Sequence, residues 1–240
     1  MAMIYKTTLK PGKTELLTAW LPTRPWYAST GHAPELDRSG GFRLDDPEGA
    51  VGIEFMVLTD TSGGRETSYL VPLTYRDAPL DGAEAALVGT SEHGVLGTRW
   101  VYDGAHDPVL VGQLLALIQG RAVAQDQCDS DVPDPSVTAL FAGAGPEIAT
   151  VLSREGLDTS DTARGTDVVV VGARAAGTPG TPGTPPVLSV TRVLRPEDAR
   201  EDACIAAGVT GRITAGWSTP DGSAHRGTFA TLRGPARGAA

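Results

Sequence analysis

The chain has 240 residues, enough for one large domain or two small ones with a properly buried core. Its 20 Lys and Arg residues against 29 Asp and Glu residues give a net charge of -9, which repels nucleic-acid phosphates and anionic membrane surfaces. We therefore expect no nucleic acid and no membrane among the partners. Because no apolar stretch reaches the roughly 18 residues of a membrane span, we expect a soluble, cytoplasmic protein.

Two features of the residue inventory remove further kinds of chemistry. The only lysines are Lys6, Lys10 and Lys13, so most of the chain has no lysine for a phosphate clamp or a Schiff base. The two cysteines, Cys128 and Cys204, lie far apart and have no metal-type spacing around them. We expect both to be buried small hydrophobic residues, and we expect no cofactor and no metal.

The first elements follow from apolar periodicity. A strand is predicted at 3–9 and a short helix at 13–21, after the Pro-Gly break between them. The alternation of apolar and polar residues over 41–59 and 67–75 predicts an antiparallel hairpin with one buried face, turning at 62–64.

A second group of elements ends the first half of the chain. A short helical piece is expected at 83–88 and a strand at 94–103. A clear apolar helix should follow over 107–121, with Asp107 as its N-cap and Pro108 in its first turn. The polar stretch 125–135 is typical of a connector.

The remaining residues are predicted to form a second small unit. Its expected elements are a region of mixed helical signals from 136, a strand at 166–171, a Gly-Thr-Pro loop at 177–186, a strand at 187–194, a helix at 196–207 and a hairpin over 212–232. The predicted fold class is therefore α+β: a curved antiparallel sheet with packed helices, followed by a second small α+β unit. The corresponding boundaries are 1–104, 105–135 and 136–240.

Several motifs suggest chemistry but have simpler interpretations. Gly143-Ala144-Gly145 lacks the third glycine of a dinucleotide loop, and Asp60-Thr61-Ser62-Gly63 is better explained as the hairpin turn. The acidic group Asp45, Asp46 and Glu48 surrounds Pro47 and Gly49, as in a solvated turn, rather than in a cation site.

Three histidines and two aromatic residues are candidates for function. His93, His106 and His225 have no nucleophile motif in sequence with them, which favours structural or surface roles. Trp26 and Tyr27 follow a stiff Pro-containing segment, where they form either a lid over the sheet or an aromatic contact surface for a sugar or a partner.

The first 104 residues resemble the N-terminal cap domain of bacterial maltokinases and of related glucosamine kinases. The resemblance is carried by five segments: Ile4-Tyr5-Lys6-Thr7-Thr8-Leu9, Glu15-Leu16-Leu17, Gly52-Ile53-Glu54-Phe55, Tyr69-Leu70-Val71-Pro72-Leu73, and Val101-Tyr102-Asp103 leading to His106-Asp107-Pro108. It implies a cap-type fold for this part of the chain.

Residues 136–233 resemble, in the order of their elements, the N-lobe of a kinase of the same family. The resemblance places a phosphate-binding lysine in the strand at 187–194, where this chain has Ser189. The chain then stops where the hinge to the C-lobe of such kinases would lie, without the catalytic Asp and metal ligands of that lobe. The resemblance thus implies a degenerate N-lobe that does not transfer phosphate.

Two hypotheses on function follow. The favoured one is a non-catalytic binding or regulatory module, near trehalose, maltose, glycogen or aminosugar metabolism, that binds a protein partner, itself or a sugar. We expect a protein partner or self-association through the uncovered face of the helix at 196–207 and the strand at 212–218. The candidate interaction residues are Trp26, Tyr27, His93, Trp100, His106 and Asp107. The alternative is a small carbohydrate-active or hydrolytic enzyme with a cleft between the two units.

Overall fold

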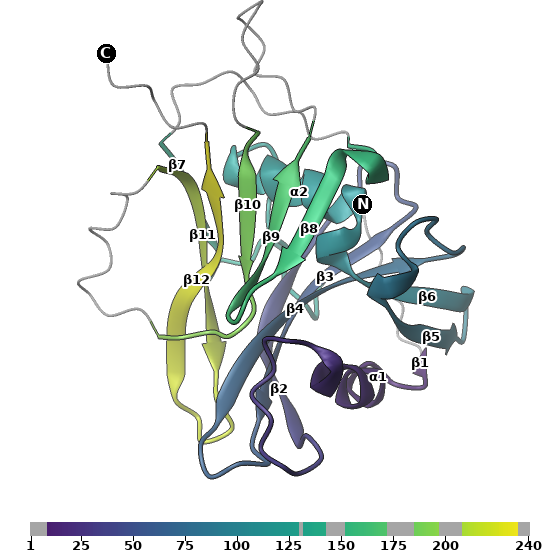
Figure 1. Cartoon of the computed structure of the whole chain (residues 1–240), viewed down its shortest axis with the longest axis vertical. Coiled ribbons are helices and arrows are strands. Elements are labelled where there is room, and N and C mark those ends of the chain that lie inside the picture. The colour runs from purple at the N-terminus through teal and green to yellow at the C-terminus, as the bar shows by residue number, and fades with distance from the viewer. Residues whose placement is uncertain (1–8, 130–131, 143–151, 172–184, 197–207, 235–240) are drawn as a thin grey trace, which may run out of the picture.

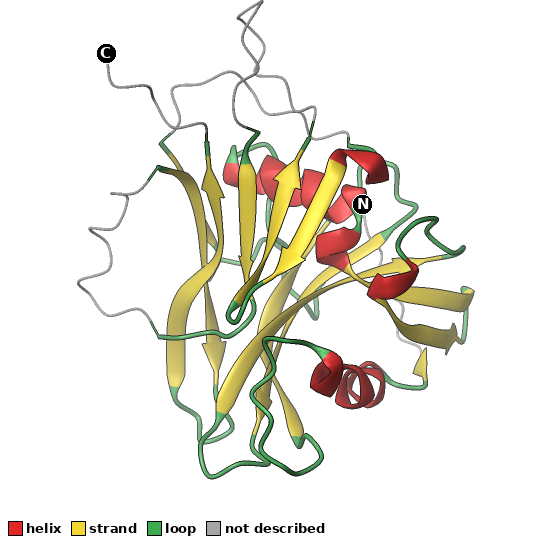
Figure 2. Ribbon diagram, viewed as in Figure 1, coloured by secondary structure: helices red, strands yellow, loops and turns green. Residues whose placement is uncertain are grey.

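The structure, a computed structural model, describes residues 9–129, 132–142, 152–171, 185–196 and 208–234. The helices are α1 Lys13–Trp20 and α2 Pro108–Ile118, with 3-10 turns η1 Leu21–Thr23, η2 Glu84–Ala86, η3 Gly104–His106 and η4 Arg154–Gly156. The strands are β1 Leu9–Lys10, β2 Leu36–Leu44, β3 Gly52–Asp60, β4 Thr67–Arg76, β5 Leu87–His93, β6 Gly97–Asp103, β7 Thr138–Phe141, β8 Leu157–Asp161, β9 Gly165–Val170, β10 Val187–Thr191, β11 Val209–Ser218 and β12 Ala224–Arg233. Antiparallel strands thus dominate, and the two α-helices are short (Figure 2).

All twelve strands belong to one strongly curved antiparallel sheet. Its order is β1-β5-β6-β4-β3-β2-β11-β12-β10-β9-β8, with β7 paired to β11 (Figure 1). The segment after β10 then returns to the free edge of β4, where Val193 pairs with Tyr69. Backbone N–H groups of Leu70 and Leu194 donate to the carbonyls of Arg192 and Ser68, each at 2.9 Å. The two halves of the chain are therefore joined along both sides of the first hairpin.

A single large core lies inside this curve and draws on residues from both sides of the predicted connector. Phe42 of β2 stacks on Phe55 of β3, with ring centroids 4.4 Å apart, and also lies near Phe229 of β12. Helix α2 is apolar around most of its circumference and is buried in the same core, as expected for a helix without a solvent face. Its start is fixed as predicted, because the Asp107 carboxylate accepts the Val109 N–H at 2.9 Å.

A second, smaller core lies on the other side of the first hairpin. Helix α1 covers this side with Leu17 and Trp20, which pack with Met56 of β3, Val71 of β4 and the side chain of Trp26. The hairpin β3–β4 is therefore buried on both faces. The prediction of one buried face was wrong, because α1 and the segment after it cover the side that the alternation assigned to solvent.

The bend in β2 depends on two consecutive glycines. Gly40 and Gly41 have φ angles of +141° and +125° and sit at a register shift between β2 and β3. The bend brings Gly40 opposite Trp217 of β11, which is the pair that joins the two halves of the sheet. A Cβ on Gly41 would collide with the carbonyl of Phe55. The close approach and the positive φ together require glycine at this position.

The structure confirms most predicted elements and corrects others. The helix at 13–21, the hairpin over 41–75, the start of α2 and the strands at 166–171 and 187–194 are present, as is the hairpin β11–β12. Only a 3-10 turn forms in the piece expected to be helical at 83–88, and β5 begins at Leu87 because its N–H and C=O groups are completed by β6.

Other differences concern strands that periodicity did not show. Strand β2 begins at Leu36 rather than near residue 41, and α2 ends at Ile118, before residue 121. In the region from 136, the described residues 138–141 form β7, since the edge of β11 supplies its hydrogen bonds, whereas residues 143–151 lie outside the described residues. Strand β8 was not anticipated. Most of the predicted strand at 3–9, the Gly-Thr-Pro loop and most of the helix at 196–207 lie outside the described residues.

The glycine requirement in β2 gives a first prediction. Gly41→Ala should lower the free energy of unfolding by more than about 2 kcal/mol, because the added methyl group forces strand β2 away from β3. Urea denaturation measures this. Gly64→Ala is the matched control: a Cβ there meets nothing within 4 Å, and the change should stay within about 0.5 kcal/mol. Equal stability of both variants would contradict the role of Gly41.

Candidate functional site

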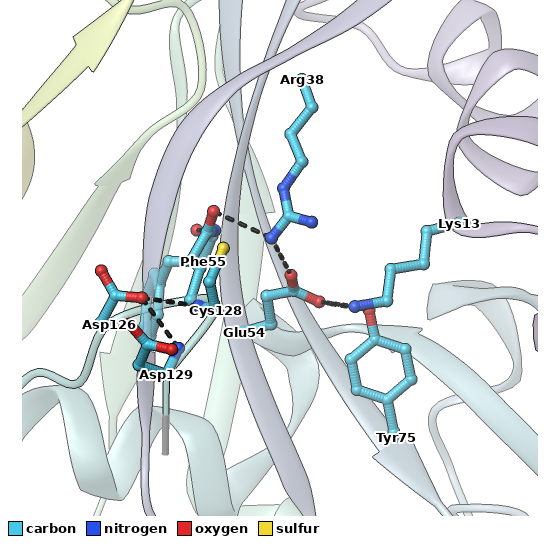
Figure 3. A network of polar contacts seen from close by, with 9 residues as sticks. Lys13, Arg38, Glu54, Phe55, Tyr75, Asp126, Cys128 and Asp129 are labelled. Carbon is cyan, nitrogen blue, oxygen red and sulfur yellow. Dashed lines mark hydrogen bonds and ion pairs between the residues drawn. The ribbon is translucent and has the colours of Figure 1, made fainter. Parts of the chain in front are cut away.

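One polar cluster lies where α1 meets the first hairpin, around the buried carboxylate of Glu54 on β3 (Figure 3). Lys13 Nζ donates to Glu54 Oε2 at 2.5 Å, and the Tyr75 hydroxyl donates to the same oxygen at 2.7 Å. Arg38 Nη2 donates to Oε1 at 3.1 Å. Glu54 is 4% exposed, whereas the side chains of Lys13 and Arg38 are 31% and 42% exposed. The carboxylate is thus an anchor that holds two partly exposed cations.

The same cluster reaches the loop after α2. Arg38 Nη2 also donates to Gln127 Oε1 at 2.9 Å, and Gln127 Nε2 donates to the Phe55 carbonyl at 3.1 Å. The neighbouring Asp126 accepts the backbone N–H groups of Cys128 and Asp129 (Figure 3). The loop is therefore tied to the hairpin, although its composition is typical of a free connector.

The electrostatics of Glu54 keep it ionised. Burial alone would raise the pKa of its carboxyl, but the charge and hydrogen bond of Lys13, the Tyr75 hydroxyl and Arg38 bring it below the ordinary value of 4.5. Burial and the adjacent Glu54 raise the pKa of Tyr75 well above 10, so its phenol stays protonated and donates. The arrangement is suited to holding charges in place rather than to moving protons near neutral pH.

A second cluster is more deeply buried and joins the two halves of the chain. Arg192, directly after β10, is fully buried, and its Nη2 lies 2.7 Å from each carboxylate oxygen of Asp103 at the end of β6. Its Nε donates to Thr166 of β9 at 2.8 Å, and the Thr166 hydroxyl donates to Asp161 of β8 at 2.6 Å. The ring of Trp26 covers the guanidinium, 5.1 Å from centroid to Cζ.

Asp107, a predicted interaction residue, is occupied in the interior. It is fully buried, and its two carboxylate oxygens accept Nε and Nη2 of Arg76, each at 2.7 Å, while also capping α2. The two-bond geometry of this pair is the strong form of an arginine–carboxylate contact. The prediction of Asp107 as an interaction-surface residue was therefore wrong.

The predicted aromatic residues divide between core and surface. Trp26 is 2% exposed and packs with Trp20 and Tyr69, which confirms the lid interpretation and excludes its indole from the surface. Tyr27 is half-buried, and its hydroxyl donates to Asp60 at 2.7 Å. Burial, followed by the hydrogen bond and the charge of Asp60, raises the pKa of Tyr27 to about 12. Trp100 is partly exposed beside the small cluster that contains Tyr102.

The three histidines have separate structural neighbours. His93 Nδ1 accepts the backbone N–H groups of Val95 and Leu96 and shapes the β5–β6 turn. His225 lies 3.2 Å from the Thr219 hydroxyl in the β11–β12 turn. His106 Nδ1 lies 2.9 Å from the Thr159 hydroxyl of β8, a contact between the two halves of the chain. The structure does not bring them together with one another.

The acidic segments form turns, although Asp46 is buried rather than solvated. Asp46 accepts the N–H groups of Glu48, Ala50 and Val51, so its carboxylate closes a turn. Asp60 likewise accepts the N–H groups of Glu35 and Ser62 at the hairpin end. Within the described ranges, no group of three or more His, Cys, Asp or Glu side chains is placed to hold a metal ion.

Two predictions about burial were wrong. Cys128 is exposed, because it sits in the turn that Asp126 closes with its carboxylate and not in a core. The strand at 212–218 does not leave an uncovered apolar face, because Ile213, Ala215 and Trp217 are buried in the large core. Cys204 and the Gly143–Gly145 motif lie outside the described residues.

Ser189, the predicted counterpart of a phosphate-binding lysine, lies on β10. Its register partners are Asp167 on β9 and Thr231 on β12. Its hydroxyl is buried, and in the part of the chain that the structure describes it has no hydrogen-bond partner. A short neutral side chain on this strand offers no cation to a phosphate.

Sequence analysis missed the residues at the centres of the two clusters, Glu54 and Arg192. Each is a charged residue in an otherwise apolar strand or strand end, and a charge at such a position requires a partner when it is buried. That signal could have marked both residues, but it could not have named their partners.

The fold is a sheet-rich, antiparallel one with two short α-helices in the described residues. None of the described helices is long and apolar enough to cross a membrane. Comparison with protein families identifies part of the chain: residues 20–107 match the maltokinase N-terminal cap domain. This stretch runs from Trp20 to Asp107, covers less than half of the chain and is similar to that cap domain, which supports the resemblance stated for residues 1–104. We call residues 20–107 the cap-like region.

The buried ion pair gives a second prediction. Arg192→Met should destabilise the protein by about 3–5 kcal/mol, because Asp103 is left as a buried charge without its partner. Urea denaturation of Arg192→Met, Asp103→Asn and the double variant measures the interaction free energy between the two side chains, which should be about 0.5–3 kcal/mol. Arg65→Met, at an exposed arginine, is the control and should change little. Additive losses in the double variant would contradict direct coupling.

The Glu54 cluster gives a third prediction, on pH. The folded-state pKa of Glu54 lies below its unfolded value, so its stabilising contribution is complete above about pH 4.5 and is lost as pH falls through the folded pKa. Glu54→Gln should therefore be less stable than wild type by about 1–3 kcal/mol at pH 7, and the difference should shrink towards pH 3.5. Exposed Glu35→Gln is the control. A difference that does not change with pH would contradict the ionised anchor.

Proposed function

We propose that the chain is a non-catalytic binding or regulatory module related to the N-terminal part of maltokinase-type sugar kinases. The match of the cap-like region to the maltokinase cap domain supports the family setting. Such a module would act near maltose, trehalose, glycogen or aminosugar metabolism, where kinases that carry this cap domain would be natural partners.

One observation carries the non-catalytic part of the proposal: the buried acids are committed to the fold. Glu54, Asp103 and Asp107 are each no more than 4% exposed, and all their carboxylate oxygens accept hydrogen bonds from protein donors. A general acid or base must reach a proton on the substrate. These carboxylates instead neutralise Lys13, Arg38, Arg192 and Arg76 within the protein.

The second half of the chain extends the proposal to a degenerate kinase N-lobe. Strands β9 and β10 followed by the β11–β12 hairpin occur in the order that the resemblance implies. Phosphoryl transfer depends on cations that stabilise the charge of the transferred group. Strand β10 carries Ser189 at the position that the resemblance assigns to a phosphate-binding lysine, and no lysine follows residue 13 in the sequence. This supports a lobe that has lost its phosphate-binding role.

The contacts of the histidines do not favour the alternative, a small hydrolytic enzyme. His93 caps a turn through Nδ1, and His106 and His225 have threonine hydroxyls beside their rings. A nucleophile activated by histidine would require that hydroxyl to face a substrate, with a third group to orient the ring. The Thr159 hydroxyl on β8 instead contacts the His106 ring, where the two halves of the chain meet.

The proposal leads to a fourth prediction, on nucleotide binding and transfer. The purified chain should show no thermal stabilisation with Mg-ATP, since a ligand raises stability only by binding the folded state. It should also form no sugar phosphate from ATP with maltose or glucosamine. A catalytically competent maltokinase, assayed under the same conditions, is the positive control. A saturable shift with Mg-ATP, or phosphorylated sugar above background, would contradict the proposal.

A second arm of that experiment addresses binding. Maltose, glucosamine and a purified maltokinase-type kinase should be titrated into the chain by calorimetry, with sedimentation of the chain alone at micromolar concentration to detect self-association. A module of this kind should bind at least one of these ligands or itself. A monomer that binds none of them would leave the binding role without support.

A further inference from the structure

The turn η3 connects the cap-like region to the second half of the chain through two side chains. Asp103 closes the start of η3 by accepting the Ala105 N–H at 3.2 Å, and the same carboxylate holds Arg192. His106, at the end of η3, meets Thr159 of β8 at 2.9 Å. Strand β8 is the terminal strand on its side of the sheet, with β9 as its paired strand. The His106–Thr159 contact therefore fastens a strand that is hydrogen-bonded along one edge.

The strongest charge effects on His106 are of both signs. They come from the carboxylates of Asp103 and Asp161 and the guanidinium groups of Arg192 and Arg154, on the β6 end, β8, the segment after β10 and η4. These four groups together carry no net charge that an added proton would neutralise. Arginine stays protonated throughout the pH range of proteins. A protonated His106 would thus be an uncompensated cation in a largely buried place.

We propose that His106 makes the contact between η3 and β8 sensitive to acid, so that a proton taken from solvent onto its ring favours release of β8 from the cap-like region. Release uncovers Leu157, which is 5% exposed in the large core, and opens the side of η3 that faces β8 and β9. The buried Arg192–Asp103 pair joins the end of β6 to the segment after β10 without a residue of β8. The opening that we propose concerns the β8 side of the sheet.

The direction of the pH effect follows from linkage. Burial, which is the main cause, and the two arginines lower the pKa of His106 against the opposing effect of Asp103 and Asp161. A histidine whose folded-state pKa is depressed stabilises the closed state fully above its ordinary value of 6.5, and this stabilisation is lost as pH falls towards the folded pKa. Each unit of difference between the two pKa values changes the opening equilibrium by about tenfold.

Hydrogen exchange of the β8 peptide tests the proposal. After correction for intrinsic exchange rates, the opening of residues 157–161 should be at least about threefold greater at pH 5.5 than at pH 7.5 in the wild-type chain. His106→Gln, which keeps a polar group next to Thr159 but gains no proton, should show no such change. His32→Gln, at an exposed histidine, is the matched control and should behave as wild type.

Two outcomes would overturn the proposal: equal opening of wild-type β8 at both pH values, or a pH effect that persists in His106→Gln. Should His106→Gln fail to fold, an NMR titration of the histidine rings in the wild-type chain replaces it. The exchange of β8 should then follow the titration of His106. Exchange that follows a different histidine would equally reject the role of His106.

Discussion

Arg192 places a full positive charge in the interior of the molecule, and the arrangement of the two halves of the chain depends on how that charge is neutralised. Its counter-ion, Asp103, belongs to the end of β6, and its remaining contacts come from Thr166 of β9 and the ring of Trp26. Because a buried charge without a partner is costly, β6, β9 and the segment after β10 must meet at one point. The backbone pairing of Val193 with Tyr69 then closes the curve of the sheet beside it.

The cap-like region is consequently completed by residues that lie outside it. The family match ends at Asp107, yet Asp103 within it is neutralised by Arg192, and His106 contacts Thr159. The large core is continuous across the same boundary, with Phe42 and Phe55 packed near Phe229. The strands of the cap-like region and those of the second half belong to one sheet and share this core, so the two parts of the chain have a fixed relation to each other.

The two polar clusters differ in what they can offer a partner. In the Arg192 cluster the ion pair with Asp103 is buried and serves cohesion. The Glu54 cluster holds Lys13 and Arg38 at the surface, so that a chain with a net charge of -9 presents two ordered cations beside α1. Holding long side chains in one geometry reduces the entropy that a binding event would otherwise remove. Of the two clusters, the Glu54 cluster is therefore the one that presents partly exposed cations held by a buried carboxylate.

Local sequence determined those parts of the structure whose cause is local. Apolar periodicity and turn residues were sufficient for α1, the β3–β4 hairpin and the β11–β12 hairpin, and Asp107 with Pro108 fixed the start of α2. Strand β5 and strand β7 lacked such a pattern, since their hydrogen bonds depend on β6 and β11. The ion pair of Asp103 with Arg192 spans 89 residues, and the ring of Trp26 covers its guanidinium. Only the tertiary structure decided these contacts, because a single sequence shows that a buried charge needs a partner but not which residue the folded chain will bring to it.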